Sequence, residues 1–447
     1  MSTLLLLLVA CGPTTEKDTA GTVDDGVFGD VSARLSSGTT TVAIVNWTGD
    51  LEGAWVEFGP DEGYSELAPE RAAGEAVLLG NHAATEVHYR VGAEIDGELV
   101  YTSDHTITTG ELPSGVPVVT AERTDDTAWG RWVLTSYFDL GSGSAGLVIL
   151  DEDGAVVWYH ETENGWIPAE RATIDGRGIQ WLWAEDVVNT STAEICTVDM
   201  DGEQESCIST PNAHHDFLNL DDGSLVYLQS EDEEWEGYRL EGDLLIQRDA
   251  DGTSRTLWDA FDDITPVPSD QWRSGPDGNI DWTHCNGIWQ DEANGDWIIS
   301  SFQMSDVRRV SASTGHSAWI LGGETNEFAM NGVGFGPQHA PQLVDGGLML
   351  FDNGPEPDAS RAVRFALDED ALTATEVYSY AHPTDKHAHA MGDANLTAAD
   401  YVTISFGDLG DLAIWSPEGE QVWWWDSPTS TATGQVHVFA DLYTLAE

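Results

Sequence analysis

The chain has 447 residues with 17 Lys and Arg against 79 Asp and Glu, so its formal net charge is −62. A surface this acidic excludes a nucleic-acid-binding protein, because a polyanion binds by releasing its counterions to basic side chains. It also disfavours docking to anionic lipid through charge. Hydrophobic residues make up 41% and aromatic residues 9%, enough apolar material for a folded protein. The length predicts two or three domains, or a small domain before a large repeat fold.

The first residues carry a targeting pattern. The apolar run Leu4–Ala10 is too short for a hydrocarbon core about 30 Å thick, but it suits the apolar region of a signal peptide. The segment Leu8–Gly12 resembles a bacterial lipobox. That resemblance implies that residues 1–10 are a lipoprotein signal peptide and that Cys11 is lipidated, which anchors the protein in the bacterial cell envelope. A buried N-terminal strand is the alternative. Residues 11–28, rich in Thr, Asp and Gly, are expected to be a flexible tether.

Residues 29–112 have the pattern of a small all-β sandwich, with short alternating strands between polar turns. The expected strands are Thr40–Trp47, Ala54–Phe58, Glu86–Ala93 and Val100–Thr109. The segments Thr85–Val91 and Ile107–Thr109 resemble a fibronectin type III-like domain.

From residue 116 to 447 one unit repeats: a strand, an acidic turn with glycine, and a second strand that often ends in Trp. Copies occur at Val148–Trp158, Glu194–Cys207, Leu245–Trp258, Val307–Trp319, Ala362–Tyr380 and Ala413–Trp423. Hairpins that recur about every 50 residues are typical of propeller blades of four strands. The expected fold is therefore all-β, a six-bladed β-propeller over 116–447 preceded by the sandwich. The Asp-x-Asp-Gly turns lack the distal carboxylates of a calcium loop, so they predict no metal.

Two of the cysteines are placed to form a disulfide. Cys196 and Cys207 lie symmetrically about the turn at Asp201-Gly202, so they are expected to face each other on paired strands. An envelope location permits the bond. Cys285 is then left as a buried thiol.

Histidines open three of the predicted inner strands, at His215, His284 and His339. The interval from histidine to turn glycine is equal for His215 and His339 and three residues longer for His284. Equivalent positions of successive blades lie on one ring around the channel, so the three imidazoles are expected at one mouth. His389 opens the corresponding strand of the sixth blade and is expected beside them. An imidazole can attack, move a proton or bind a metal near neutral pH.

The segments around these histidines resemble the bacterial arylsulfate sulfotransferase family. The resemblance is carried by His214–Asp216, Asp281–Gly287, Ile299–Ser301, Thr314–Gly315, Trp319–Gly323, Gln338–Gln342 and Phe351–Gly354. It implies a six-bladed propeller of the cell envelope that moves a sulfuryl group from a phenolic sulfate to a phenol without a cofactor. It also implies that His339 is the nucleophile that carries the sulfuryl group. His215 and His284 would bind the sulfuryl oxygens or exchange protons with the phenols.

One position departs from the family pattern, which has an Arg directly after the two serines Ser300 and Ser301. Here Phe302 follows them, and it cannot replace a planar guanidinium that pairs with sulfate. Either another cation reaches the site or the activity has changed. The predicted substrate-binding residues are His214, Trp282, Asn286, Phe302 and His389, of which Trp282 and Phe302 are candidates for stacking on a phenol.

Two other functions stay open. Three histidines with Asp216 also suit a metal-dependent propeller hydrolase. Alternatively the propeller binds a ligand without chemistry, and the 19 Trp residues suit an aromatic or carbohydrate ligand. Most of these Trp residues recur at hairpin ends, where packing between blades is the expected role.

Overall fold

The structure is a computed structural model that describes residues 21–139, 141–187, 190–268, 272, 278–355, 358–428 and 431–445. The predicted signal peptide and Cys11 lie outside these residues. Within them, no helix is long and apolar enough to cross a membrane.

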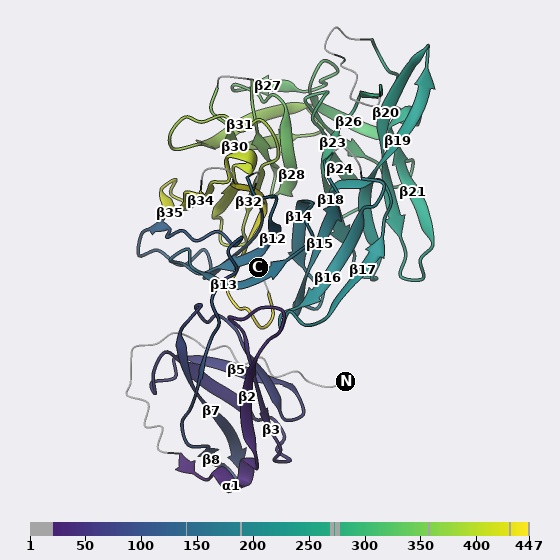
Figure 1. Cartoon of the computed structure of the whole chain (residues 1–447). Coiled ribbons are helices and arrows are strands. Elements are labelled where there is room, and N and C mark those ends of the chain that lie inside the picture. The colour runs from purple at the N-terminus through teal and green to yellow at the C-terminus, as the bar shows by residue number, and fades with distance from the viewer. Residues whose placement is uncertain are drawn as a thin grey trace.

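Six sheets follow one another around a central channel, each forming one blade of a propeller (Figure 1). The innermost strands contact their neighbours around this ring. They are β36 (Thr431–Phe439), β14 (Trp166–Ala172), β18 (Ala213–Asn219), β23 (Cys285–Gln290), β28 (Gln338–Val344) and β32 (Asp393–Leu396). The prediction of an all-β, six-bladed propeller is confirmed.

The outer strands complete the blades in chain order. The first three blades add β11 (Trp132–Asp139), β12 (Ala145–Leu150) and β13 (Val156–Glu161); β15 (Gly178–Ala184), β16 (Glu194–Asp199) and β17 (Glu205–Ser209); and β19 (Leu225–Trp235), β20 (Tyr238–Arg248) and β21 (Ser254–Asp259), followed by helix α2 (Ala260–Asp263) and edge strand β22 (Ile280–Asp281). The last three add β24 (Trp297–Ser301), β25 (Asp306–Val310) and β26 (Ser317–Gly322); β29 (Gly347–Asp352), β30 (Arg361–Asp368), β31 (Thr373–Ala381) and edge strand β27 (Ala329–Asn331); and β33 (Val402–Ser405), β34 (Leu412–Trp415) and β35 (Gln421–Trp425), with the 3-10 turn η1 (Gly407–Leu409) between β33 and β34. Each of the six predicted hairpins forms the third and fourth strands of a blade, counted outward from the channel.

The two ends of the propeller segment interlock. Strand β36, from the C-terminal end, is the innermost strand of the first blade and pairs with β11. Strand β10 (Glu122–Arg123), from the N-terminal end, is the outermost strand of the last blade and pairs with β35. Each of these blades therefore takes a strand from the opposite end of the segment, so main-chain hydrogen bonds close the ring.

Tryptophans at the hairpin ends join neighbouring blades, as the sequence predicts. Trp158 is fully buried, and its Nε1 donates to the carbonyl of Met200 in the next blade, 2.9 Å away. Trp423 is equally buried and donates to the carbonyl of Glu152 at the same distance. A buried indole needs such an acceptor, so each pair combines apolar packing with a satisfied hydrogen bond.

The N-terminal unit is a nine-stranded sheet that folds over on itself. Strand β5 pairs with β4 along its first part and with β6 along its second, so it belongs to both halves. The two halves enclose one apolar core, which includes Val45, Phe58 and Val91. The strands are β1 (Thr22–Val23), β2 (Val31–Leu35), β3 (Ala43–Trp47), β4 (Trp55–Gly59), β5 (Glu66–Ala72), β6 (Glu75–Leu78), β7 (Glu86–Ile95), β8 (Glu98–Tyr101) and β9 (His105–Thr108). A small β-sandwich before the propeller is confirmed, whereas its likeness to fibronectin type III stays a prediction.

The end of the predicted tether is folded. Strand β1 pairs with β8, and helix α1 (Asp25–Phe28) follows it. Phe28 is fully buried in the core of the sandwich. One aromatic residue in a polar stretch gave a weak signal, and burial of its ring adds to the strand pairing that holds this segment on the domain.

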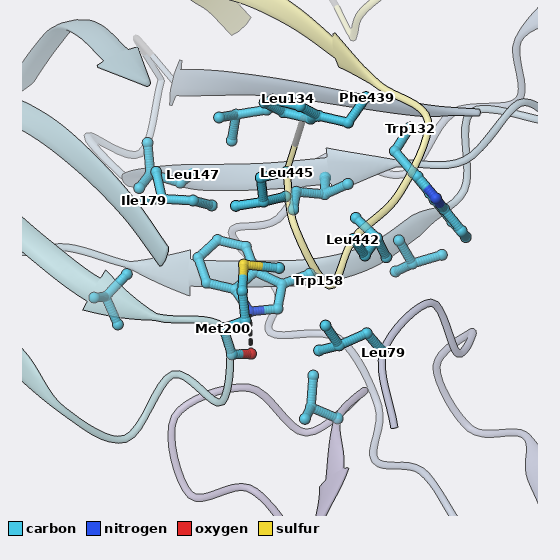
Figure 2. Packing of buried hydrophobic residues seen from close by; sticks show 14 of the residues in the cluster. Leu79, Trp132, Leu134, Leu147, Trp158, Ile179, Met200, Phe439, Leu442 and Leu445 are labelled. Carbon is cyan, nitrogen blue, oxygen red and sulfur yellow. Dashed lines mark hydrogen bonds between the residues drawn. The ribbon is translucent and has the colours of Figure 1, made fainter. Parts of the chain in front are cut away.

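The N-terminal unit packs against the propeller through an apolar contact (Figure 1). Val42, Ile44, Val77 and Leu79 share one cluster with the first two blades and with the C-terminal residues Leu442 and Leu445. Figure 2 shows Leu79 on the same side of the cluster as Leu442. Ion pairs border this contact: Arg34 with Glu203, and Arg71 with Asp201.

The structure joins Cys196 and Cys207 by a disulfide between directly opposed residues of β16 and β17. Their Cα atoms are 4.0 Å apart. Cys285 is a buried free thiol, and burial raises its pKa well above the usual value.

Candidate active site

Three inner strands are irregular where the histidines stand. The pairing shifts register after His214 in β18, after Cys285 in β23 and after His339 in β28. His215 and His284 have left-handed backbones, with φ of 59° and 48°. Bulges of this kind re-aim side chains, here at the start of each inner strand.

One of the three histidines, His339, stands one residue earlier in its strand than the other two do in theirs. In the fifth blade the left-handed backbone falls on Ala340, with φ of 49°, so His339 comes one residue before the position equivalent to His215. The equal histidine-to-glycine intervals in the sequence concealed this difference. The local bulges offset it, because all three imidazoles still meet at one mouth of the channel.

The imidazoles form a connected group of rings. The centroids of His215 and His284 are 4.7 Å apart. The ring of Phe302 lies between those of His284 and His339, with centroid distances of 5.5 Å and 5.2 Å. The ring of Trp166 meets that of His215 edge-on at 4.8 Å. Each of the three histidines therefore contacts an aromatic side chain.

A small cavity lies beneath this group. Its volume is about 20 Å³, enough for a single water molecule. Its lining comes from all sides of the channel: Trp166, Pro168, His215, Asn286, His339, Ala340, Met391, Gly392, Gly434 and Gln435. Larger groups must bind at the mouth above it or displace part of this lining.

Asn353 orients the imidazole of His339. The Nδ2 of Asn353 donates to the carbonyls of Ala388 and Met391, at 3.1 and 3.0 Å. Its Oδ1 therefore faces Nδ1 of His339, 2.7 Å away. An amide oxygen only accepts, so Nδ1 carries the proton and Nε2 keeps a lone pair on the cavity side. Burial lowers the pKa of His339 to about 3, and positive charge on His284 acts in the same direction.

His215 is in contact with a second, buried histidine. The Nδ1 atoms of His214 and His215 are 2.8 Å apart, and Nε2 of His214 lies 2.9 Å from Oδ1 of Asp243. Loss of water contact lowers the pKa of His215 well below its usual value, and repulsion from the neighbouring histidines, His284 first, acts in the same direction. His215 and His339 are therefore neutral imidazoles near neutral pH.

His284 is electrostatically different. Its Nδ1 makes a short hydrogen bond to Asp281, and burial opposes the charged form. The bond to Asp281 and the negative charges of Asp281, Asp243 and Glu241 outweigh burial and raise the pKa of His284. The side chain is 29% exposed, so it stands at the rim of the mouth. The site thus places one histidine with a raised pKa beside two with lowered pKa values.

The remaining predicted site residues have different positions. Asn286 lines the cavity; its Nδ2 donates to the carbonyl of Gln338, and its buried Oδ1 has no partner among the described residues. His214 is buried behind His215 and does not line the cavity. Trp282 is buried against Phe261. His389, which the sequence placed beside the three histidines, is exposed and outside the cavity lining, and its ring meets that of His387 edge-on at 4.8 Å.

The histidine group does not have the geometry of a metal site. In the part of the chain that the structure describes, two groups of His, Cys, Asp and Glu have ligand atoms within 4.8 Å of one another, and neither contains a site histidine. Asp216, the carboxylate expected with them, is engaged elsewhere. It accepts from Arg171 at 2.7 Å and from the main-chain nitrogen of Ile288 at 2.9 Å.

The comparison with protein families shows to which family the chain belongs. The arylsulfotransferase (ASST) family matches residues 135–422, which include all three histidines and four complete blades. The chain belongs to the arylsulfotransferase family. No curated protein matches it.

Several solved structures are similar to this arylsulfotransferase-family chain at low sequence identity. A protein of unknown function from Bacteroides caccae is 13% identical over 69% of this chain and 98% of its own, with a TM-score of 0.41. A chain of the nidogen/laminin complex is 10% identical over 68% of this chain and 97% of its own, with a TM-score of 0.44. Virginiamycin B lyase from Staphylococcus aureus is 11% identical over 72% of this chain and 100% of its own, with a TM-score of 0.37. At these values, none of these likenesses says what the present chain does.

Three residues at this arylsulfotransferase site had no role assigned from the sequence. Asn353 lies in a segment that carries the family resemblance, but its contact with His339 depends on the fold. Asp281 also lies in such a segment, three residues before His284. Asp243 left a weak signal, because it directly precedes the apolar run Leu244–Ile246, and it is 4% exposed in the structure. A buried charge needs a partner, which only the folded chain identifies.

Proposed function

We propose that the protein is an arylsulfate sulfotransferase that moves a sulfuryl group from a phenolic sulfate to a phenol. The observation that carries the proposal is the division of charge among three histidines at one mouth. The pKa values of His339 and His215 are lowered, which keeps them neutral, and the pKa of His284 is raised, which favours its cation. A nucleophile, a proton-transfer group and an anion-binding group are the parts that this reaction needs.

His339 is the proposed nucleophile. Its Nε2 lone pair forms a bond to sulfur while the bond between sulfur and the phenolic oxygen breaks, and the leaving phenolate takes up a proton. In the second half the acceptor phenol loses its proton, its oxygen bonds to sulfur, and the bond between sulfur and Nε2 breaks. The orientation imposed by Asn353 supports this role, because it keeps the proton on Nδ1 in the free enzyme.

His284 is the proposed replacement for the family's arginine. Phe302 occupies the arginine position and lies between His284 and His339. The imidazolium of His284 supplies positive charge beside that position, maintained by Asp281. One imidazolium offers fewer hydrogen bonds than a guanidinium, so we expect weaker binding of the sulfuryl oxygens than an arginine would give.

The aromatic part of the substrate is proposed to bind above the cavity. The cavity holds about one water molecule, so a phenyl ring does not fit inside it. Phe302 is partly exposed at the mouth and offers a ring face next to the nucleophile. Trp282 is buried against Phe261, which argues against the stacking role that the sequence suggested for it.

The test is turnover of an aryl sulfate by the chain from residue 21 onward, with a phenol as acceptor. We expect transfer in the wild-type protein, a sulfated His339 peptide by mass spectrometry, and loss of both in His339→Ala. His316→Gln is the matched control, because His316 is 58% exposed on an outer hairpin. A folded wild-type protein that binds aryl sulfate but shows neither turnover nor sulfated peptide would support the ligand-binding alternative.

We further propose that lipidation of Cys11 anchors the enzyme in the bacterial envelope, on the lipobox resemblance of Leu8–Gly12. Cys11→Ser is expected to leave the protein unprocessed or released from membranes, as judged by fractionation and precursor size. Membrane retention of Cys11→Ser with normal processing would contradict the proposal.

A further inference from the structure

We propose that the anchored protein holds the mouth of the channel at His215, His284 and His339 (the histidine mouth) away from the membrane. It therefore transfers sulfuryl groups between phenols dissolved in water and does not reach a phenol at the bilayer surface. This orientation rests on the proposed function and on the proposed lipidation of Cys11. It adds a class of acceptor that the site alone does not define.

The histidine mouth marks one face of the propeller. The three histidines stand at the starts of inner strands β18, β23 and β28, so these strands end at the opposite face. Successive strands of a blade are antiparallel, so the turn between the third and fourth strands also lies at the opposite face. In the first two blades these are the turns at residues 151–155 and 200–204, and the chain after β36 reaches the same face at residues 440–445.

The N-terminal unit docks on that opposite face. Nε2 of His82 lies 2.7 Å from Oδ2 of Asp151 in the first of these turns. The main-chain nitrogen of Ser37 donates to Oε1 of Glu203 in the second turn, at 3.1 Å. The apolar contact between the two units includes residues 442 and 445 of the C-terminal segment. The N-terminal unit and the histidine mouth therefore lie on opposite faces of the propeller.

Residues 21–28 lie at the end of the N-terminal unit that is farthest from the propeller. Strand β3 runs away from the propeller, and after it the main-chain nitrogen of Gly49 donates to the carbonyl of Phe28 at 2.7 Å. Strand β1 pairs with β8 just after the turn at Asp96-Gly97, which joins the outer ends of β7 and β8. The chain from Cys11 therefore joins the folded molecule at the end opposite to the histidine mouth.

The hairpin of β19 and β20 extends the molecule on the mouth side. Strand β18 begins at Ala213, opposite Gln229 of β19, and β19 continues past this point to Trp235. Figure 1 shows the tip of this hairpin and helix α1 at opposite ends of the molecule. The hairpin thus projects away from the end at which the anchored segment joins.

The segment between the anchor and the fold is too short to turn the molecule over. Gly21 comes ten residues after Cys11, and a fully extended chain of that length spans at most about 36 Å. Strands β7 and β18, of 10 and 7 residues, run along the N-terminal unit and across the propeller, and at about 3.3 Å per residue they span roughly 55 Å together. A histidine mouth laid on the bilayer would lift Gly21 by this larger distance.

The histidine mouth of the anchored protein then faces water. A dissolved aryl sulfate and a dissolved phenol reach it by diffusion. A phenol fixed at the bilayer does not, because two partners on one surface gain from proximity only where the geometry lets them meet. Anionic lipid also repels a chain with a formal net charge of −62.

The first test measures the orientation without activity. The full-length lipidated protein is reconstituted in phosphatidylcholine vesicles with an acceptor dye in the bilayer, and carries a fluorophore on Glu98→Cys or on Glu234→Cys. Both positions are exposed, one at the outer end of the N-terminal unit and one on the β19–β20 hairpin. The disulfide and the buried thiol of Cys285 do not compete for the label.

We expect strong energy transfer from position 98 and, from position 234, transfer no greater than that of an unanchored chain. The matched controls are the same labelled variants from residue 21 onward, which should show no transfer from either position. Equal transfer from the two positions, or stronger transfer from position 234, would overturn the proposal. A full-length protein that the vesicles do not retain would overturn the anchoring and the orientation together.

The second test compares a phenol dissolved in water with the same phenol linked to a phospholipid headgroup in the vesicles, each with an aryl sulfate as donor. With the dissolved phenol, the anchored protein and the chain from residue 21 should have equal rates. With the lipid-linked phenol, the anchored protein should have no advantage, whereas partners that can meet on one surface gain on the order of 10²–10⁴-fold. Such a gain in the wild-type protein would overturn the proposal.

A longer connection is the matched control for distance. Insertion of about 60 Gly and Ser residues after Gly12 gives a flexible chain whose mean span approaches the size of the molecule, so this variant should gain the advantage that the wild-type protein lacks. No gain in this variant either would overturn the role of distance. If no acceptor is sulfated at all, the proposed function fails, while the energy transfer still decides the orientation.

Discussion

Oδ1 of Asn353 lies 2.7 Å from Nδ1 of His339, and the Nδ2 of the same amide is bound to two main-chain carbonyls. The amide cannot flip without losing both of those bonds. The fold therefore selects one tautomer of the proposed nucleophile, and this contact yields the first of four predictions.

Asn353→Asp should slow transfer near neutral pH. A carboxylate beside Nδ1 favours the imidazolium and raises the pKa of His339 from about 3, so Nε2 is protonated over a wider range. We expect activity to fall at low pH and to recover as pH rises through the new pKa. The measurement is kcat/KM against pH. A variant with the wild-type acid limb would show that Asn353 does not control His339.

The charge of His284 predicts the basic limb of the pH profile. Its pKa is raised, so the imidazolium persists above the usual 6.5 and is lost as pH rises through the shifted value. Removing the main partner, by Asp281→Asn, should move the basic limb to lower pH. Inhibition by inorganic sulfate should follow the same shift. If the basic limb does not move in Asp281→Asn, a group other than His284 is responsible for that limb.

Phe302→Arg should make anion binding independent of His284. Phe302 lies between His284 and His339, so a guanidinium there supplies charge that does not titrate. We expect KM for aryl sulfate to fall most at high pH, where wild-type His284 is neutral. At low pH repulsion between the two cations reduces the gain. A uniform rise in KM would mean that the mouth has no room for the longer side chain.

Leu79→Ala should destabilise the whole chain. Leu79 is 5% exposed and packs in the cluster shared by the N-terminal unit, the first two blades and Leu442. Truncation of a buried leucine costs about 2–5 kcal/mol. Leu99→Ala is the control, because Leu99 is 41% exposed and should change the free energy of unfolding by less than about 0.5 kcal/mol. Denaturant unfolding measures both. An equally small effect at Leu79 would mean that the two units are independent.

Hairpin periodicity was enough to predict the propeller and its six blades. Each outer hairpin is a local unit, with a turn between strands close in sequence, so its signal lies within about 15 residues. Closure of the ring was not predictable in the same way. The pairings of β36 with β11 and of β10 with β35 join segments about 300 residues apart, and no local pattern encodes such partners.

The candidate site likewise has features that the sequence predicted and features that it did not. Residue type and phase indicated His215, His284 and His339, because equivalent positions of a repeat meet around the channel. The sequence by itself therefore determined that these three imidazoles meet, although the same argument placed His389 beside them and the structure leaves it outside the cavity lining. Their protonation states were decided only by the tertiary structure, because they depend on the hydrogen bonds with Asn353 and Asp281, on neighbouring charges and on exclusion of water. Hydrogen bonds and burial act over a few ångströms in space, and that proximity is a property of the folded chain.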